Sequence, residues 1–184
     1  MQVAIIGAGP LGRWLALAAA RAGYSVRLED VMPSNLHHAQ EYVRQQLNAE
    51  ALPSVAFVST IEEAVREADL AIDCVPDELE SKLEIFCLLD RMAPPRTVLV
   101  TPSKRLSIAD LASCTYRAEK CVALVADVHE LTGASLGEEH GSGSGAEILL
   151  RTPPQVAAES VAMVQEFWER MGFVPRFEAD RTRL

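Results

Sequence analysis

Short runs of apolar, mostly branched residues recur along this chain, and stretches with apolar positions at helical spacing separate them. Such runs are typical of buried parallel strands, whereas apolar residues at every third or fourth position predict one-sided helices. The clearest helix has Leu83, Phe86 and Leu89 on one face. Strands are expected at 3–6, 25–30, 55–59, 69–75, 96–100, 121–126, 148–150 and 173–177. Helices are expected at 14–20, 77–92, 107–114 and 154–171, and a further helix is expected to begin near residue 60.

This alternation of strands and helices predicts an α/β fold, a doubly wound Rossmann-type sheet that is largely parallel and carries helices on both faces. The chain has 184 residues, of which 49% are hydrophobic, enough for one domain with a sizeable core. We therefore expect residues 1–184 to form a single domain. The glycine- and serine-rich stretch 133–145 is expected to be a loop.

The first predicted strand runs directly into a G-x-G-x-x-G turn, which opens a helix. In this context the spacing is typical of dinucleotide-binding sites. Gly7 permits the tight turn, Gly9 lets backbone amides approach a pyrophosphate, and Gly12 lets the helix pack closely on the sheet. The missing N–H of Pro10 costs nothing in a first helical turn, and the helix N-terminus offers its free N–H groups to phosphates. The expected cofactor-binding residues of this turn are Gly7, Ala8, Gly9, Pro10, Leu11 and Gly12.

An acidic residue, Asp30, ends the second predicted strand, 18 positions after Gly12. A carboxylate there accepts hydrogen bonds from the adenosine ribose hydroxyls and repels a 2′-phosphate, which favours NAD over NADP. The alternative is that Asp30 only caps the segment that follows it.

Composition narrows the class of protein further. Lys and Arg number 17 against 26 Asp and Glu, giving a net charge of −9, which argues against a nucleic-acid partner. The four cysteines show no C-x-x-C spacing and are expected to be reduced core thiols, and no metal site is expected. No apolar run is long enough to span a membrane, and the first strand begins at Met1 without room for a leader. These features predict a cytoplasmic protein.

Three blocks of sequence carry a family resemblance. They are V-A-I-I-G-A-G-P-L-G-R through A-G-Y-S-V-R-L-E-D within residues 3–30, A-D-L-A-I-D-C-V-P-D-E-L-E-S-K at 68–82, and L-S-I-A-D-L-A at 106–112. Together they resemble the NAD-binding domain of the 3-hydroxyacyl-CoA dehydrogenases, over almost the whole chain. The resemblance implies NAD as cofactor. It also implies that Asp77 and Lys82 line the nicotinamide end of the cofactor site, beside Val75 and Pro76. Alternatively, Asp77 is an ordinary acid at a helix N-terminus and Lys82 a solvated lysine.

The positions that carry the family's chemistry depart from its pattern. The family's reaction needs a histidine base, a glutamate that orients it, and serine and asparagine side chains that position the substrate oxygen. In a gapless alignment Val125 stands at the histidine and Val128 at the asparagine. Lys104 and Arg105 replace the two serines, whereas Glu147 matches the glutamate.

His129 lies just beyond the end of the strand that should carry the base, so a His129–Glu147 pair is the candidate catalytic pair. The alternative is a solvated loop histidine. Lys104 and Arg105 are candidates to hold a carboxylate or phosphate of a small substrate, and the alternative is a pair of solvated charges.

Members of the family continue past the end of this chain into a helical domain that covers the acyl pocket and forms the dimer. Three functions stay open. The chain is an NAD-dependent oxidoreductase acting alone on a 3-hydroxy or 3-oxo acyl substrate, a dehydrogenase domain completed by a partner or a second copy, or a catalytically inactive NAD(H) sensor. The apolar face of the last helix, with Phe167 and Trp168, is buried either within the domain or in a homodimer.

Overall fold

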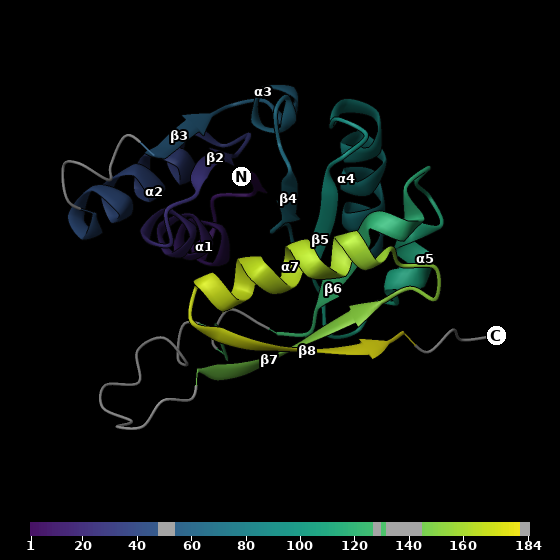
Figure 1. Ribbon diagram of the computed structural model, residues 1–184. Helices are drawn as coiled ribbons and strands as arrows, with labels where there is room; N and C mark the ends of the chain where they lie inside the picture. The colour runs from purple at the N-terminus through teal and green to yellow at the C-terminus, as the bar shows by residue number, and fades with distance from the viewer. Residues whose placement is uncertain (48–53, 127–129, 132–144, 181–184) are drawn as a thin grey trace.

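The computed structural model describes residues 1–47, 54–126, 130–131 and 145–180 of the chain (Figure 1). Strands and helices alternate along it. The elements are β1 (Gln2–Ile6), α1 (Pro10–Arg21), β2 (Ser25–Glu29), α2 (Pro33–Gln46), β3 (Val55–Val58), α3 (Ile61–Val65), β4 (Leu70–Asp73), α4 (Leu79–Met92), β5 (Val98–Pro102), α5 (Ile108–Ala112), the 3₁₀ turn η2 (Ala118–Lys120), β6 (Cys121–Leu124), β7 (Ala146–Thr152), α7 (Ala158–Arg170) and β8 (Phe173–Ala179).

The strands form one sheet in the order β3-β2-β1-β4-β5-β6-β7-β8. All neighbouring pairs are parallel except β6 and β7, which are antiparallel. The predicted doubly wound, largely parallel sheet is therefore confirmed. From β1 the strand order runs outward first through β2 and β3 and then, on the other side, through β4 and β5. The crevice for ligands in such sheets lies at the carboxyl ends of the strands where the order reverses, here β1 and β4.

Two apolar cores lie on the two faces of the sheet because successive side chains of a strand point to opposite faces. In β1, Val3 and Ile5 belong to the core that contains α1, α2 and α7. Ala4 and Ile6 belong to the core that contains α3, α4 and α5. Helices on both faces, as expected from the sequence, are thus present.

Several predicted boundaries differ from the structure by a few residues, and two of them have a clear physical reason. The predicted strand 148–150 is the centre of the longer β7, in which Ile148, Leu150 and Thr152 alternate with more exposed residues, so the apolar run is shorter than the strand. Helix α7 begins at Ala158 rather than at 154, because the segment before it forms a turn in which the Val156 N–H donates to the Pro153 carbonyl.

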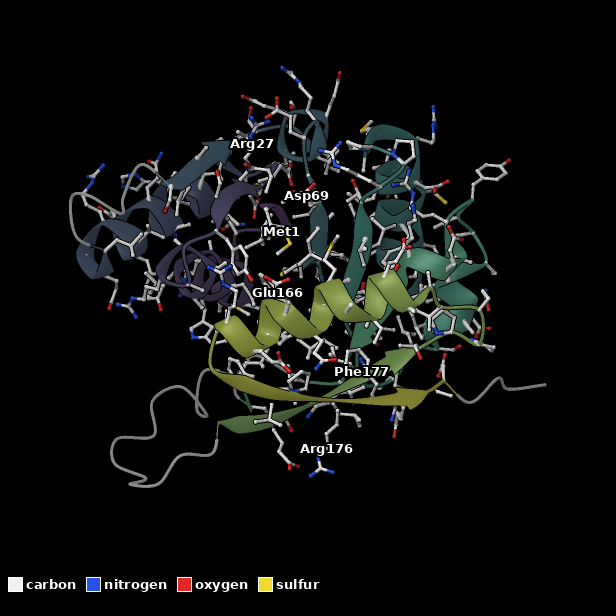
Figure 2. The ribbon with its side chains drawn as sticks, viewed as in Figure 1. Met1, Arg27, Asp69, Glu166, Arg176 and Phe177 are labelled. Atoms are coloured by element: carbon white, nitrogen blue, oxygen red, sulfur yellow. The ribbon has the colours of Figure 1, made fainter. Side chains whose placement is uncertain are left out.

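Helix α7 crosses over one side of β7 and β8 (Figure 1). Its apolar face is buried within the chain, where Phe167 stacks near Tyr24 and Trp168 meets the edge of Phe173. Of the two alternatives for this face, the structure supports burial within the domain. Arg176 lies on the side of β8 that faces away from α7 (Figure 2). Within the described residues, no helix is long and apolar enough to cross a bilayer.

Candidate functional site

A cavity of about 740 Å³ opens at the carboxyl ends of β1, β2, β4 and β5. Its size lies within the range of about 300–1,000 Å³ that is usual for cofactor and small-molecule sites. The cavity extends from the glycine turn and the end of β2, past the turn after β4, to the segment after β5. Its lining includes Gly7, Gly9, Pro10, Leu11, Glu29, Asp30, Val31, Asn35, Ile61, Cys74, Val75, Pro76, Asp77, Ser103, Lys104, Arg105 and Ala126.

The three glycines of the turn have distinct surroundings. Gly7 has φ +99°, a conformation that side chains rarely adopt, and its N–H donates to the Glu29 carbonyl. A Cβ on Gly12 would overlap the carbonyl oxygen of Gly7, so the helix and the turn touch directly at this point. A Cβ on Gly9 would meet no atom within 4 Å. Open space beside the Gly9 backbone, in a cavity wall, is what a closely approaching pyrophosphate requires.

The N-terminus of α1 points its backbone donors at the same space. Gly9 caps the helix without a side-chain hydrogen bond, Pro10 follows, and the first turn carries no acidic residue. The first N–H groups of a helix have no partner within it, and the helix dipole favours an anion there. The residues present therefore fit a dinucleotide pyrophosphate.

Asp30 is buried and is held by three donors. Its Oδ2 accepts the Ala8 N–H at 2.8 Å and the Asn35 side-chain amide at 3.0 Å, and its Oδ1 accepts the Met32 N–H at 2.8 Å. Asp30 thus ties the glycine turn to the start of α2 while also lining the cavity. Because a carboxylate offers about four lone-pair positions, little acceptor capacity is left for a ribose hydroxyl.

A second carboxyl, which is not among the site residues expected from the sequence, lies beside Asp30. Glu29 lines the same end of the cavity and is 5% exposed. Burial, and secondly the charge of Asp30, raises the pKa of Glu29 to about 7. A strand-ending Glu-Asp pair is the sequence signal that could have pointed to it.

Asp77 lies in the turn after β4 and lines the cavity together with Val75 and Pro76. Its Oδ1 is buried and has no hydrogen-bond partner among the described residues. Its other oxygen is 4.0 Å from the Arg105 Nε, and its backbone carbonyl accepts from Arg105 at 3.3 Å. A buried acceptor without a donor, in the wall of a cavity, is a place for a hydrogen-bond donor of a ligand.

Lys82 lies behind the cavity wall rather than in it. Its side chain is fully buried, and its Nζ donates to Asp73 Oδ2 at 3.1 Å and to the Val75 carbonyl at 3.3 Å. Asp73 also accepts from the Thr101 hydroxyl at 3.0 Å. The solvated-lysine alternative is therefore wrong, and the expected place of Lys82 in the lining is corrected. Lys82 instead holds the backbone of the turn that contains Val75.

Lys104 and Arg105 both line the cavity, but each faces an acid of the chain itself. The Lys104 Nζ lies 2.6 Å from a carboxylate oxygen of Glu130, and Arg105 bonds Asp77 as described. The two basic side chains adjoin the cofactor cavity, yet an anionic substrate would have to compete with these acids.

The candidate catalytic pair is not brought together in the described structure. His129 and Val128 lie outside the described residues. Glu147 lies on β7, forms an ion pair with Arg176 of β8, and is not among the residues that line the cavity. Arg176 projects from the side of the sheet opposite to α7 (Figure 2).

The cysteines only partly match the expected core thiols. Cys121 is buried and Cys87 is exposed, whereas Cys74 and Cys114 are half-buried. Burial raises the pKa of Cys114 to about 11 and that of Cys121 to about 12, so both stay thiols at neutral pH. Cys74 lines the cavity, where burial raises its pKa as well. Among the described residues, no three potential metal ligands converge.

The chain is similar in sequence to one family of known proteins. Residues 2–126 match the family described as "3-hydroxyacyl-CoA dehydrogenase, NAD binding domain". A probable 3-hydroxybutyryl-CoA dehydrogenase of Bacillus subtilis is 29% identical over 136 residues, which are 67% of this chain and 47% of that protein. The mouse lambda-crystallin homolog is 31% identical over 134 residues, 65% of this chain and 42% of that protein.

Among solved structures, the (S)-3-hydroxybutyryl-CoA dehydrogenase of Ralstonia eutropha superposes with a TM-score of 0.82 at 19% identity. The match covers 98% of this chain and 64% of that one, and it shows the shared fold. The chain spans about half the length of the curated relatives it matches.

Proposed function

The chain belongs to the family of NAD-binding domains of 3-hydroxyacyl-CoA dehydrogenases, and from this premise we propose that it is the cofactor half of such an oxidoreductase. The proposed reaction is hydride transfer between NAD and a 3-hydroxy or 3-oxo acyl substrate. Such a reaction belongs to fatty acid metabolism or to a related pathway of acyl thioesters.

The observation that carries this proposal is the continuity of the cavity from the glycine turn to Ser103, Lys104 and Arg105. A site that only anchored the pyrophosphate and adenosine would not need the far end. There the unpaired Oδ1 of Asp77 supports a nicotinamide end, because the carboxamide group of that ring is a hydrogen-bond donor.

Different residues of the chain bind the cofactor, orient it and support its site. The glycine turn and the N-terminus of α1 bind the pyrophosphate, and Asp30 fixes the shape of that turn. Asp77 orients the nicotinamide end, and Lys82 supports the turn before it. When bound, NAD supplies the hydride acceptor, and the protein supplies binding, orientation and a proton acceptor.

We assign the proton acceptor to His129, with Glu147 as its orienting group, as the sequence predicts. For this role Glu147 must break its ion pair with Arg176 and form a hydrogen bond with His129 instead. Lys104 and Arg105 bind the anionic part of the substrate after releasing Glu130 and Asp77. In this proposal a partner or a second copy of the chain covers the acyl group, so a homodimer is part of it.

A specific observation also favours a second function, that of a catalytically inactive NAD(H) sensor. Val125 occupies the position of the family's base, and the matching glutamate is engaged by Arg176. In this second function the same cavity binds NAD(H), but no hydride transfer follows.

Turnover of NADH separates the two. The purified chain is mixed with NADH and either acetoacetyl-CoA or free acetoacetate, and loss of NADH absorbance is followed. We expect oxidation of NADH that His129→Ala abolishes, whereas His38→Ala, a change on the exposed side of α2, leaves the rate unchanged. Replacing Lys104 and Arg105 together by Ser should raise the KM for the anionic substrate while NADH binding is kept. NADH that binds but is never oxidised would favour the sensor.

A further inference from the structure

The side chain of Glu29 points into an otherwise apolar part of the molecule. In the sheet it lies between Ile6 of β1 and Val58 of β3, which are its register partners. Both neighbours belong to the core on the α3 side, and the half-buried Ile61 at the start of α3 lines the same end of the cavity. Strand alternation therefore directs Glu29 to the α3 side and its neighbour Asp30 to the α2 side.

The two adjacent carboxyls differ in what they bind. Asp30 accepts three hydrogen bonds, whereas no described residue donates one to the Glu29 carboxyl. At 5% exposure, Glu29 has little contact with water either. Its carboxyl is thus largely removed from water and, among the described residues, has no donor, so its acceptor positions are open toward the cavity that it lines.

No basic group among the described residues compensates Glu29. Arg27, on the same face of β2, bonds the Glu63 carbonyl at 2.8 Å and Glu67 at 3.3 Å. Lys82 is held by Asp73, and Lys104 and Arg105 lie at the other end of the cavity. Asp30 is the charge that acts on Glu29, and it repels a second negative charge. The missing partner is therefore expected to come from outside the chain.

The position of Glu29 indicates which part of a dinucleotide could supply the donor. The pyrophosphate binds at the glycine turn, and Asp77 marks the nicotinamide side toward β4 and β5. Glu29 lies on the opposite side, at the end of β2, where the adenosine half must lie. Adenosine carries two kinds of donor, the adenine amino group and the ribose hydroxyls.

We propose that the carboxyl of Glu29 accepts a hydrogen bond from the adenosine half of NAD and is a specificity-determining residue of the cofactor site. The inference rests on the cofactor binding in the proposed function. Asp30, whose acceptor positions are mostly filled by protein donors, shapes the turn, and Glu29 is the acceptor that no described residue fills.

Glu29→Met tests this proposal because methionine matches the length of glutamate but offers no strong acceptor. NADH binding to the full chain is measured by fluorescence titration, and chemical unfolding is measured without ligand. We expect the Kd for NADH to rise about tenfold, equivalent to about 1.4 kcal/mol. The same variant should resist denaturant better than the wild type, because a buried carboxyl without a donor has been removed. Weaker binding by a more stable protein cannot result from misfolding.

Glu84→Met is the matched control, since Glu84 is exposed on α4 and outside the cavity lining, and its Kd should not change. Two analogues identify the donor: reduced nicotinamide hypoxanthine dinucleotide, which lacks the adenine amino group, and 2′-deoxy-NADH, which lacks one ribose hydroxyl. The wild type should bind one of them more weakly than NADH, and Glu29→Met should no longer distinguish that analogue from NADH. An unchanged or lower Kd in Glu29→Met, or equal discrimination in both proteins, would overturn the proposal. Failure of the wild type to bind NADH would instead overturn the proposed function.

Discussion

The two ends of the cavity are built differently. At the adenosine end, short hydrogen bonds to Asp30 hold the glycine turn and the start of α2, and the N-terminus of α1 leaves its first N–H groups open. At the reaction end, Lys104 and Arg105 are engaged by acids of the chain, and Glu147 lies with Arg176 outside the lining. One end is ready for a ligand, and the other must change its contacts before it can act.

On the proposed function, this difference separates cofactor binding from chemistry in the fold. Binding groups come from the backbone of one strand-turn-helix unit, which the sheet holds in place. The residues proposed for the reaction, Lys104, Arg105 and Glu147, are instead paired with other charged residues of the chain, and His129 lies outside the described residues. The following predictions test each side of the contrast.

The largest effect is expected at the glycine turn. In Gly12→Ala the new Cβ would overlap the Gly7 carbonyl, so the unfolding free energy should fall by about 4 kcal/mol and NADH binding should be lost. Gly9→Ala is the matched variant, because its Cβ enters open space. It should unfold like the wild type, while its Kd for NADH rises at least about tenfold. Urea unfolding and NADH titration check both. Equal loss of stability in the two variants would contradict the division of roles.

The second-largest effect is expected for the buried ion pair of Asp73 and Lys82, which lies behind the cavity wall. Lys82→Met leaves the buried Asp73 carboxyl without its partner, and should cost about 3 kcal/mol in urea unfolding. The double variant Asp73→Asn with Lys82→Met removes both charges and should recover most of that loss. A cost well below about 1 kcal/mol for Lys82→Met would show that the pair does not hold the turn.

Asp30→Asn replaces one acceptor oxygen with a donor that faces the Ala8 N–H or the Met32 N–H. The turn should loosen, and the Kd for NADH should rise about tenfold. The preference for NADH over NADPH should shrink at the same time, because the charge that repels the 2′-phosphate is gone. Parallel titrations with both cofactors measure this, and an unchanged preference would assign selectivity to another group.

The smallest effect concerns stability and pH at Glu29. Its pKa in the folded protein is about 7, above the ordinary value of 4.5. The folded state therefore keeps a proton that the unfolded chain has lost, and this contribution to stability is full below about pH 4.5 and is lost as pH rises through about 7. Glu29→Gln carries no such proton, so its gain over the wild type should be larger at about pH 8 than at about pH 6, by about 1 kcal/mol. Urea unfolding at both pH values measures the gain, and a pH-independent difference would show that Glu29 titrates normally.

Much of the adenosine end could be predicted from the sequence because local chemistry determines it. The spacing of Gly7, Gly9 and Gly12 between a strand and a helix has one common structural solution, and the structure has it. Asp30 lies in the cavity as expected, but its three hydrogen bonds from Ala8, Met32 and Asn35 depend on where α2 starts, which no spacing in the sequence indicates.

The reaction end could not be predicted in the same way, since its contacts join distant segments. A lysine in an amphipathic helix is usually solvated, but Lys82 is drawn inward by Asp73, nine residues earlier on a buried strand. The partner of Glu147 comes from β8, and the sequence alone does not show which residue of β8 lies opposite it. Glu29 was missed because strand alternation shows that it faces away from Asp30, but not that a cavity lies there.

The most direct test of the account is a titration of the full chain with NADH and, separately, with NADPH, followed by cofactor fluorescence. We predict saturable one-to-one binding of NADH, with a Kd at least about tenfold lower than that for NADPH. Absence of saturable NADH binding, or NADPH binding of equal strength, would contradict the claim that the end of β2 and the glycine turn together bind NAD.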